Sequence, residues 1–229
     1  MRMKSLALGL AALGAMTAAA HAGNLVTNGG FEQTVNSGKQ GFFGDVTGWS
    51  GGGGLTFLDT PGTADDGSYL SVYGPFPTTS PALGNFVEAD GDPSYSSAIY
   101  QTISGLTAGQ TYDVSFWQAA GQQVGFTGPT TERWSVLLGS QTQLSTLFSL
   151  PQAGVGPWEL QNMTFTASST SEVLSFLAVG TPNGAPPISF LDGVTLNAAP
   201  EPATWAMMIL GLGGLGGIAR SRRRAAIAA

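Results

Sequence analysis

The 229-residue chain contains no cysteine and a single histidine, His21. A chain without cysteine cannot form disulfides, so an apolar core must hold its folded part together. His21 lies in an N-terminal segment with the composition of a removable leader. The rest of the chain lacks the residue that Ser-His-Asp catalysis, Cys-His catalysis and histidine metal sites all require.

Basic residues are almost absent between residues 23 and 199. This stretch holds two of the eight Lys and Arg residues, Lys39 and Arg133, and thirteen of the fourteen Asp and Glu residues. Two positive and thirteen negative charges give it a net charge of −11. Such a surface repels phosphate backbones, which excludes nucleic acid as a partner.

Residues 1–22 have the three-part layout of a secretory signal peptide. Arg2 and Lys4 come first, and an apolar stretch from residue 6 to residue 20 follows. Ala20 and Ala22 then form a small-x-small cleavage pattern around His21. The apolar stretch is too short for a comfortable membrane span. We therefore expect export, cleavage after Ala22 and a body that starts at residue 23.

The C-terminal segment also has three parts in order: Pro200-Glu201-Pro202, an uncharged apolar run from Trp205 to Ala219, and the cluster Arg222, Arg223 and Arg224. The run has 15 residues, fewer than the roughly 20 that a full membrane span needs. Arginines that follow an apolar run predict a cytoplasmic C-terminus by the positive-inside rule. With the N-terminal signal, this arrangement predicts that the acidic body lies across the membrane from the cytoplasm.

These C-terminal residues resemble the PEP-CTERM sorting signal of Gram-negative bacteria, in its PEPxxWA form. The resemblance implies a sorting segment over 200–224, with one apolar helix, and a cytoplasmic tail over 225–229. It also implies transient anchoring in the inner membrane, cleavage near the Pro-Glu-Pro by a membrane-embedded exosortase, and a mature protein at the cell surface or outside the cell. An ordinary C-terminal membrane helix is the alternative.

The body, residues 23–199, shows no helical periodicity over a full window. It consists of short β-branched and aromatic runs separated by Gly, Pro, Asn, Asp and Ser, which predicts an all-β jelly-roll sandwich. The expected strands lie near 24–27, 55–58, 69–73, 84–88, 97–103, 111–118, 133–138, 158–166, 172–179 and 188–196.

The body also resembles the galactose-binding-like jelly rolls that include many carbohydrate-binding modules. The matching pieces are 24–32, 48–49, 101–116 and 190–194. In such modules a carboxylate near each end of the domain helps to hold a structural Ca²⁺, and Glu32 and Asp192 occupy the matching positions. Gly193 departs from the family, which commonly has a second Asp or Asn there. A third side chain such as Asp59 or Asp45 would have to complete the shell, because Ca²⁺ takes six to eight oxygens.

Strand alternation predicts that three aromatic side chains lie on faces that are otherwise mainly polar. They are Tyr100, Trp117 and Trp158. One interpretation is a platform on which sugar rings stack. The other is that each ring is covered by a loop, because large aromatic side chains are mostly buried.

Three functions remain open for the body. The first is a non-catalytic module that binds exopolysaccharide, and the second is a structural surface or matrix protein without a small ligand. The third, a glycan hydrolase, needs two carboxyl groups at a set separation, with Glu88, Glu132 and Glu159 as candidates. We expect no enzyme, because the sequence places no two of these together. The acidic triplet Glu88, Asp90 and Asp92 is expected to be a solvated turn rather than a calcium loop.

Overall fold

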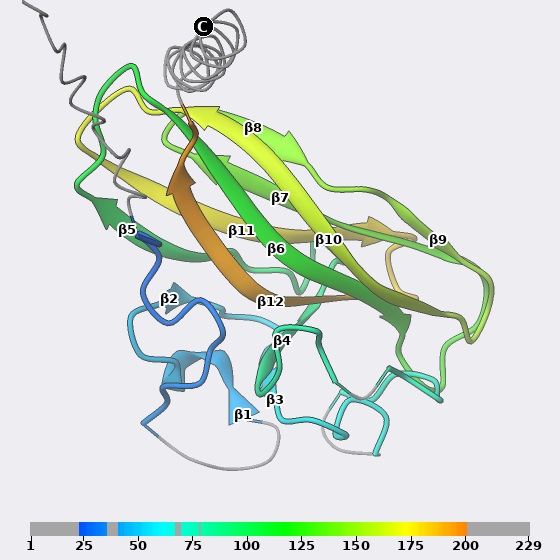
Figure 1. The fold of residues 1–229 in the computed structure, drawn as a ribbon. Helices are drawn as coiled ribbons and strands as arrows, with labels where there is room; N and C mark the ends of the chain where they lie inside the picture. The colour runs from blue at the N-terminus through cyan, green and yellow to red at the C-terminus, as the bar shows by residue number, and fades with distance from the viewer. Residues whose placement is uncertain (1–22, 36–40, 67–69, 78, 201–229) are drawn as a thin grey trace, which may run out of the picture. The chain divides into compact units, whose positions relative to one another are not determined.

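The computed structural model describes residues 23–35, 41–66, 70–77 and 79–200. The body is a compact unit, residues 22–199. Two antiparallel sheets face each other, with β6, β10 and β12 in front of β5, β7 and β11 in Figure 1. The first sheet has the order β1-β3-β4-β12-β6-β10. The second has the order β2-β5-β11-β7-β8, and β9 pairs with β7.

The strands of the first sheet are β1 (Gly41–Phe42), β3 (Thr56–Asp59), β4 (Phe86–Asp90), β6 (Thr111–Gln122), β10 (Val155–Thr166) and β12 (Pro187–Ala198). Those of the second sheet are β2 (Ser50–Gly51), β5 (Ile99–Ser104), β7 (Thr130–Leu138), β8 (Gln141–Leu144), β9 (Phe148–Leu150) and β11 (Ser171–Thr181). A short 3₁₀ turn, η1, covers Phe43–Asp45. The all-β sandwich that the sequence predicts is therefore confirmed.

The main core lies between the two sheets, and period-two alternation builds it. In β7 and β11 every second residue is buried, because successive side chains of a strand point to opposite faces. Phe116 from the first sheet and Trp134 and Phe176 from the second meet in this layer. The indole Nε1 of Trp134 donates a hydrogen bond across the sandwich to the carbonyl of Phe190, at 3.0 Å.

A second apolar cluster covers the outer face of the first sheet. It contains Phe86, Phe190 and Phe76, and Trp158 packs against it. The rings of Phe76 and Phe190 lie 4.2 Å apart. The long segment between β3 and β4, which supplies Phe76, thus closes this face of the sheet. Both clusters and the ladders around them lie within residues 23–199, so the body contains what it needs to fold by itself.

Eight of the ten expected strand regions form strands in the structure. The expectation of a strand at 24–27 is wrong: this segment only follows β12 through single hydrogen bonds, such as Leu25 N–H to the Leu196 carbonyl. Near 69–73 the described residues form one isolated bridge, between Val72 and Gln123. Conversely, β1, β2, β8 and β9 were not expected.

The strand β8 has an unusual sequence, QTQL, because its glutamines bond across to the other sheet. The side-chain amides of Gln141 and Gln143 donate to the carbonyls of Thr166 and Thr164 on β10. Strand β10 is at the edge of the first sheet, and an uncovered edge is a template for pairing with another chain. Side-chain amides therefore cap the edge of β10 that faces β8.

The last strand, β12, lies inside the first sheet, between β4 and β6. Its hydrogen bonding continues past its end, because Ala199 N–H donates to the Thr111 carbonyl at 2.9 Å. The side-chain amide of Gln110 donates to the Ala199 carbonyl at 3.3 Å. The next residue is Pro200. The folded body thus ends immediately before the Pro-Glu-Pro triplet.

Candidate functional site

The two carboxylates expected to hold Ca²⁺ meet where the N-terminal segment crosses β12. The turn at 28–31 packs on this strand, and Val194 N–H donates to the Gly29 carbonyl at 2.8 Å. Phe31, fully buried, anchors the turn in the main core. A Cβ placed on Gly30 would lie 3.9 Å from Asp192 Oδ1 and 4.0 Å from Glu32 Cγ. The fold therefore brings Glu32 and Asp192 together, as the sequence predicts.

Asp192 is completely buried. Its Oδ1 accepts a hydrogen bond from Gly193 N–H at 2.6 Å. Its Oδ2 makes no hydrogen bond of good geometry within the described part of the chain. Burial raises the pKa of Asp192 to about 7, the Ser80 hydroxyl and the Gly193 amide offset part of this, and the charge of Glu32 raises it further. A buried oxygen of this kind is a position that a cation can fill.

Glu32 is exposed and reaches over the loop that precedes β4. Its Oε1 accepts a hydrogen bond from Asn85 N–H at 2.6 Å. The Asn85 side chain donates in turn to the Phe31 carbonyl at 3.2 Å. Three segments thus meet around the two carboxylates. They are the N-terminal turn, the loop before β4 and the bulge of β12.

The departure at Gly193 has a structural cause. Gly193 lies in a bulge where the register of β12 with β6 shifts, and its φ is +61°. A Cβ there would approach Ala82 Cβ to 2.7 Å. Glycine adopts this left-handed conformation without steric cost, so a second acidic side chain does not fit at this position.

The two carboxylates supply only part of a calcium shell. The described residues contain no group of three acidic, histidine or cysteine side chains that could hold a metal. Asp59 lies on β3 and does not join the pair, and the side chain of Asp45 lies outside the described residues. Main-chain carbonyls of the converging loops would have to supply the remaining oxygens.

The three aromatic side chains of the expected platform do not share one surface. Trp117 and Trp158 are on β6 and β10 of the first sheet, and Tyr100 is on β5 of the second. The loop between β3 and β4 covers Trp158, whose Nε1 donates to the Pro77 carbonyl at 3.2 Å. Trp117 is half-buried beside the Gly193 bulge. Tyr100 is 42 % exposed.

Tyr100 belongs to a surface that the sequence analysis missed, which we call the open face. It is the outer face of the second sheet, and its central side chains are Tyr100, Thr102, Val173, Ser175, Leu177, Val179, Arg133, Ser135 and Leu137. Half-buried or exposed residues alternate with core residues along its strands. The sequence pattern that marks this face is the alternation within 131–137 and 171–181. Every second residue there, starting from Thr131 and Ser171, points outward, and none of these is acidic.

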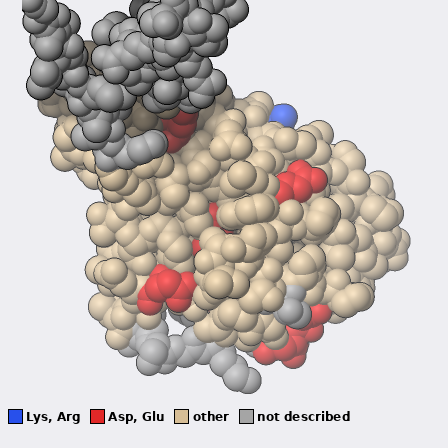
Figure 2. Space-filling model, in the orientation of Figure 1, with Lys and Arg blue, Asp and Glu red and all other residues tan. Residues whose placement is uncertain are grey.

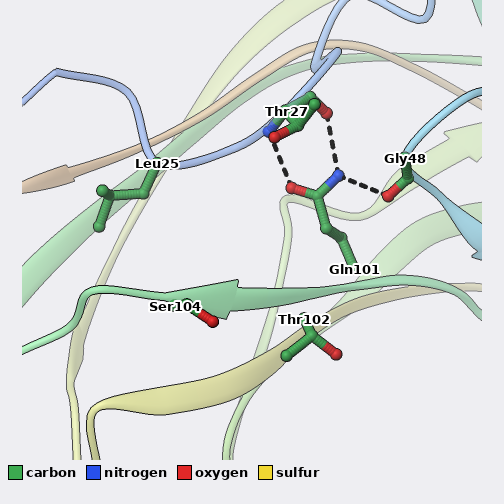
Figure 3. A pocket seen from close by; sticks show the side chains of 6 residues that line it. All are labelled: Leu25, Thr27, Gly48, Gln101, Thr102 and Ser104. Atoms are coloured by element: carbon green, nitrogen blue, oxygen red, sulfur yellow. Dashed lines mark hydrogen bonds between the residues drawn. The ribbon is translucent and has the colours of Figure 1, made fainter.

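A shallow groove lies at the edge of the open face, where the N-terminal segment meets β5 (Figure 3). It is lined by Leu25, Thr27, Gly48, Gln101, Thr102 and Ser104. The Gln101 amide holds its floor: it accepts from Thr27 N–H at 2.8 Å and donates to the carbonyls of Thr27 and Gly48 at 2.9 and 2.8 Å. The groove is continuous with the open face, because Thr102 and Ser104 lie on the outer side of β5.

The acidic triplet Glu88, Asp90 and Asp92 is buried, so the expectation of a solvated turn is wrong. Glu88 and Asp90 lie on β4. Asp92 N–H donates to Asp90 Oδ1 at 2.8 Å, and Asp92 accepts from the amides of Ser94 and Gly184 at 2.8 and 2.7 Å. Burial raises the pKa of Asp90 to about 6, and the hydrogen bonds from Ser94 and Gly184 lower that of Asp92. Asp92 thus ties the loop after β4 to the loop between β11 and β12.

The candidate hydrolase carboxyls do not form a pair. Glu88 points away from the sandwich interior, on the same side as Phe86 and Phe190. Glu132 points into the interior from β7, and Glu159 lies on edge strand β10. Neither oxygen of Glu132 makes a hydrogen bond of good geometry within the described residues. Burial raises its pKa to about 8, slightly offset by the Thr130 hydroxyl, so this carboxyl is largely protonated at neutral pH.

The C-terminal residues match the family described as "PEP-CTERM protein-sorting motif" over residues 198–224. The chain carries a PEP-CTERM sorting signal. The signal implies export and surface localisation. A comparison with curated protein sequences finds no match.

Several solved structures are similar to the body. TmCBM61, solved in complex with β-1,4-galactotriose, has 18 % identity and a TM-score of 0.44, and the match covers 77 % of this chain and 99 % of that one. The CBM22-1 xylan-binding domain of Xyn10C from Paenibacillus barcinonensis has 13 % identity and a TM-score of 0.41, with 80 % and 99 % covered. The enzymatically active domain of tailspike protein 4 from bacteriophage CBA120 has 11 % identity and a TM-score of 0.40, with 77 % and 21 % covered.

The signal-peptide residues Ala20 and Ala22 lie outside the described residues. The chain from Glu201 onward also lies outside them, and it includes Pro202, Trp205, the apolar run and Arg222–Arg224. Of the sorting-motif residues named above, only Pro200 is described. In the described part of the chain, no helix is long and apolar enough to span a membrane.

Proposed function

We propose that the body is a non-catalytic module that binds exopolysaccharide on its open face after export. The single observation that carries this proposal is the position of Tyr100. Its cross-strand neighbours are Ser50 on β2 and Ser175 on β11, and both are small. The ring is therefore accessible from above, and an exposed aromatic ring is a surface on which a sugar ring stacks.

The surroundings of Tyr100 support this role. A Cβ on Gly51 would lie 3.1 Å from two ring carbons of Tyr100, so the ring rests against the backbone of β2. A ring held in one place loses little freedom when a ligand binds. Ser175 is its cross-strand neighbour, and Thr102 and Ser104 follow two and four residues along the same side of β5. Their hydroxyl groups offer hydrogen-bond donors and acceptors to sugar hydroxyls.

The groove at the edge of the open face gives a ligand a second point of contact. Its floor is polar and fixed by Gln101 (Figure 3). A polymer that stacks on Tyr100 can continue along β5 past Thr102 and Ser104 into this groove. Extended, shallow contact of this kind suits a chain-like ligand better than a small molecule, which prefers an enclosed pocket.

In the same proposal, Ca²⁺ has a structural role between Glu32 and Asp192. It would tie the N-terminal turn to β12 of the first sheet, whereas the proposed ligand binds on the second sheet. The buried Oδ2 of Asp192, which makes no hydrogen bond of good geometry with the described residues, and the proximity of a second carboxylate support this assignment. No part of polysaccharide binding depends on it.

For the sorting segment we propose anchoring in the inner membrane of a Gram-negative cell, with the C-terminus in the cytoplasm, followed by exosortase cleavage. Hydrogen bonding through Ala199 supports a cut at or beyond Pro200, because an earlier cut would remove part of β12. The intact mass of the surface form tests this. A mature protein that lacks Trp205 and everything after it is expected, whereas one that retains Arg222 would indicate a permanent anchor.

The binding proposal is tested by affinity electrophoresis of the body, residues 23–199, in gels that contain a panel of bacterial exopolysaccharides. Tyr100→Ala should weaken retention about tenfold or more, because one stacking contact is worth about 1–3 kcal/mol. Its melting temperature should stay close to that of the wild type. Tyr95→Ala is the matched control, because Tyr95 is also exposed but lies in a loop outside the sheet.

Two results would overturn the proposal. If no polysaccharide retards the wild-type body, the structural surface protein becomes the better conclusion. If Tyr100→Ala and Tyr95→Ala weaken retention equally, the open face is not the binding surface. Release of reducing sugar by the wild type, abolished by a Glu→Gln change, would instead favour a hydrolase.

A further inference from the structure

We infer that the open face selects an anionic polysaccharide and that Arg133 recognises its acidic group. This inference rests on the proposed function, since it concerns the class of ligand that the same face takes. It depends on the distribution of charge over the two sheets and on the surroundings of Arg133.

The outer faces of the two sheets differ in charge. Alternation along the strands of the first sheet puts five acidic side chains on its outer side. Asp113 is half-buried, and the other four, Asp59, Glu88, Asp90 and Asp192, are fully buried there. In Figure 2, seen from the side of β6, β10 and β12, red acidic groups are spread over the surface and blue is confined to its margin. The strands of the open face carry no Asp or Glu on their outer side, and the acidic residues Glu132 and Glu172 on these strands are buried.

Arg133 is the only basic residue among the described residues of the body, and it lies on the open face. Its guanidinium makes no hydrogen bond or ion pair with another described residue, although this stretch of chain contains thirteen carboxylates. A guanidinium offers five donors in a planar fork that matches a carboxylate. In this protein its donors are left for a ligand.

The residues around Arg133 complete an anion-binding surface. Its cross-strand neighbour on β11 is Val179, against which the aliphatic stem can pack. The next pair along the ladder is Thr131 and Thr181, whose hydroxyls are exposed and lie 2.6 Å apart. Ser135 lies on the other side of Arg133 along β7. Three residues with hydroxyl groups therefore flank Arg133 on this face, and none of its neighbours there is acidic.

Tyr100 and Arg133 are placed so that one polymer can touch both. Tyr100 is opposite Ser175 on β11, which is opposite Leu137 on β7. Arg133 is four residues from Leu137 on the same strand. Two strand spacings across and four residues along give a separation of about 16 Å between the two backbones. A short oligosaccharide segment spans that distance.

The net charge of −11 does not prevent anion binding at this face. The acidic outer side of the first sheet lies behind a sandwich about 10 Å thick, and the Debye length at physiological ionic strength is about 8 Å. Repulsion from the far side is therefore largely screened, while a contact with Arg133 is local. Charge complementarity of this kind determines specificity more than affinity.

The test uses the body, residues 23–199, and three uronic-acid polysaccharides: alginate, polygalacturonate and hyaluronan. Each is paired with its carboxyl-reduced form, which keeps the sugar rings and removes the charge. Retention in affinity gels is measured for the wild type, Arg133→Gln, Arg133→Lys and Tyr100→Ala at two salt concentrations. Asn162→Ala, a change at an exposed polar residue on β10 of the other sheet, serves as the control and should bind like the wild type.

We expect the wild type to bind at least one acidic polymer about tenfold more tightly than its reduced form. Arg133→Gln should abolish this preference and leave binding to the reduced form unchanged. Arg133→Lys should restore part of the preference, and the difference between wild type and Arg133→Gln should shrink as salt rises. Tyr100→Ala should weaken binding to both forms.

The outcomes separate the inference from the function on which it rests. If the wild type retains acidic and reduced polymers equally, and Tyr100→Ala weakens this retention but Arg133→Gln does not, the anionic preference is overturned. The binding function then still stands. A preference for acidic polymers that survives Arg133→Gln overturns the role of Arg133. If none of the six polymers retards the wild type, the anionic inference fails, and only retention by the bacterial exopolysaccharide panel would keep the binding function. Self-association of the wild type that Arg133→Gln abolishes would identify a second copy as the occupant.

Discussion

Glu32 and Asp192 are 160 residues apart in the sequence, yet both side chains approach Gly30, with Asp192 Oδ1 3.9 Å and Glu32 Cγ 4.0 Å from the Cβ position of that residue. One carboxylate comes from the start of the body and the other from its last strand. The region is therefore formed only when the two ends of the domain have come together, and a cation bound there would stabilise the closed fold.

Millimolar Ca²⁺ should raise the melting temperature of the body, and a chelator should reverse the rise. A ligand that binds only the folded state adds about 2.7 kcal/mol at a hundredfold excess over its Kd, which corresponds to roughly 5–10 °C for a domain of this size. Glu32→Gln/Asp192→Asn should lose the response and melt near the wild-type value without calcium. Differential scanning calorimetry measures both.

The matched control for this pair is Glu159→Gln/Asp113→Asn, which removes the same two charges from sites on β10 and β6. It should keep the calcium response. If Ca²⁺ shifts the melting temperature of both double variants equally, the effect is general charge screening and the site must be abandoned.

Protonation of Asp192 should oppose calcium binding. Burial raises the pKa of this carboxyl to about 7, and a carboxylate must be deprotonated to bind a cation. The calcium-dependent rise in melting temperature should therefore be present at pH 8 and shrink as the pH falls below 7. A rise that is the same at pH 5.5 and pH 8 would show that Asp192 is not a ligand.

Glu132→Gln should stabilise the body at alkaline pH. Burial raises the folded-state pKa of Glu132 from 4.5 to about 8, so between these values the folded state binds more protons than the unfolded state. Stability then falls as the pH rises through this window. The substituted amide cannot ionise, so urea titrations should show a variant close to wild type at pH 4.5 and more stable at pH 8.5. An equal difference at both pH values would contradict a buried, protonated carboxyl.

Trp158→Ala should destabilise the body, because its ring packs on Phe86 and Phe190 with centroid distances of 5.5 and 6.3 Å. Removal of a packed aromatic side chain costs about 3 kcal/mol or more. Urea titration should show this loss, while Tyr100→Ala should leave the free energy of unfolding within about 0.5 kcal/mol of wild type. A stable Trp158→Ala variant would mean that the loop between β3 and β4 does not close this face.

Gln141→Ala/Gln143→Ala should promote self-association by freeing the edge of β10. The double variant loses two side-chain hydrogen bonds to main-chain carbonyls of this strand, and an uncovered edge pairs readily with another chain. Sedimentation velocity should show dimers or larger species that the wild type does not form. Thr142→Ala, on the outer side of the same strand, is the control and should remain like the wild type.

The sequence predicts the sheet class well because alternation is a local property. The burial pattern of β7 and β11 follows directly from every second residue. The resemblance to jelly rolls also anticipated the meeting of Glu32 and Asp192. In contrast, β8 escaped prediction because the reason for its glutamines lies on β10, more than twenty residues away.

The burial of Glu88 and Asp90 also could not be predicted. Acidic residues near Gly and Pro are usually exposed, and only the path of the loops over the outer face of the first sheet decides that these two are not. The open face was missed for a related reason. Its distinguishing property, the absence of acidic side chains around Arg133, becomes visible only when β5, β11 and β7 are laid side by side.

The position of β12 determines how the body responds to mechanical load. A force applied through the C-terminus enters the fold at Ala199 and runs along a strand that is paired with β4 on one side and β6 on the other. Pulling along that strand shears two ladders at once, and the N-terminal segment, bonded to the same strand through Leu25, is loaded with them. Forced unfolding is governed by the rate of crossing the unfolding barrier rather than by equilibrium stability. If the body is tethered through its last residues and binds a polymer, as we propose, drag on that polymer would load the strand that has paired neighbours on both sides.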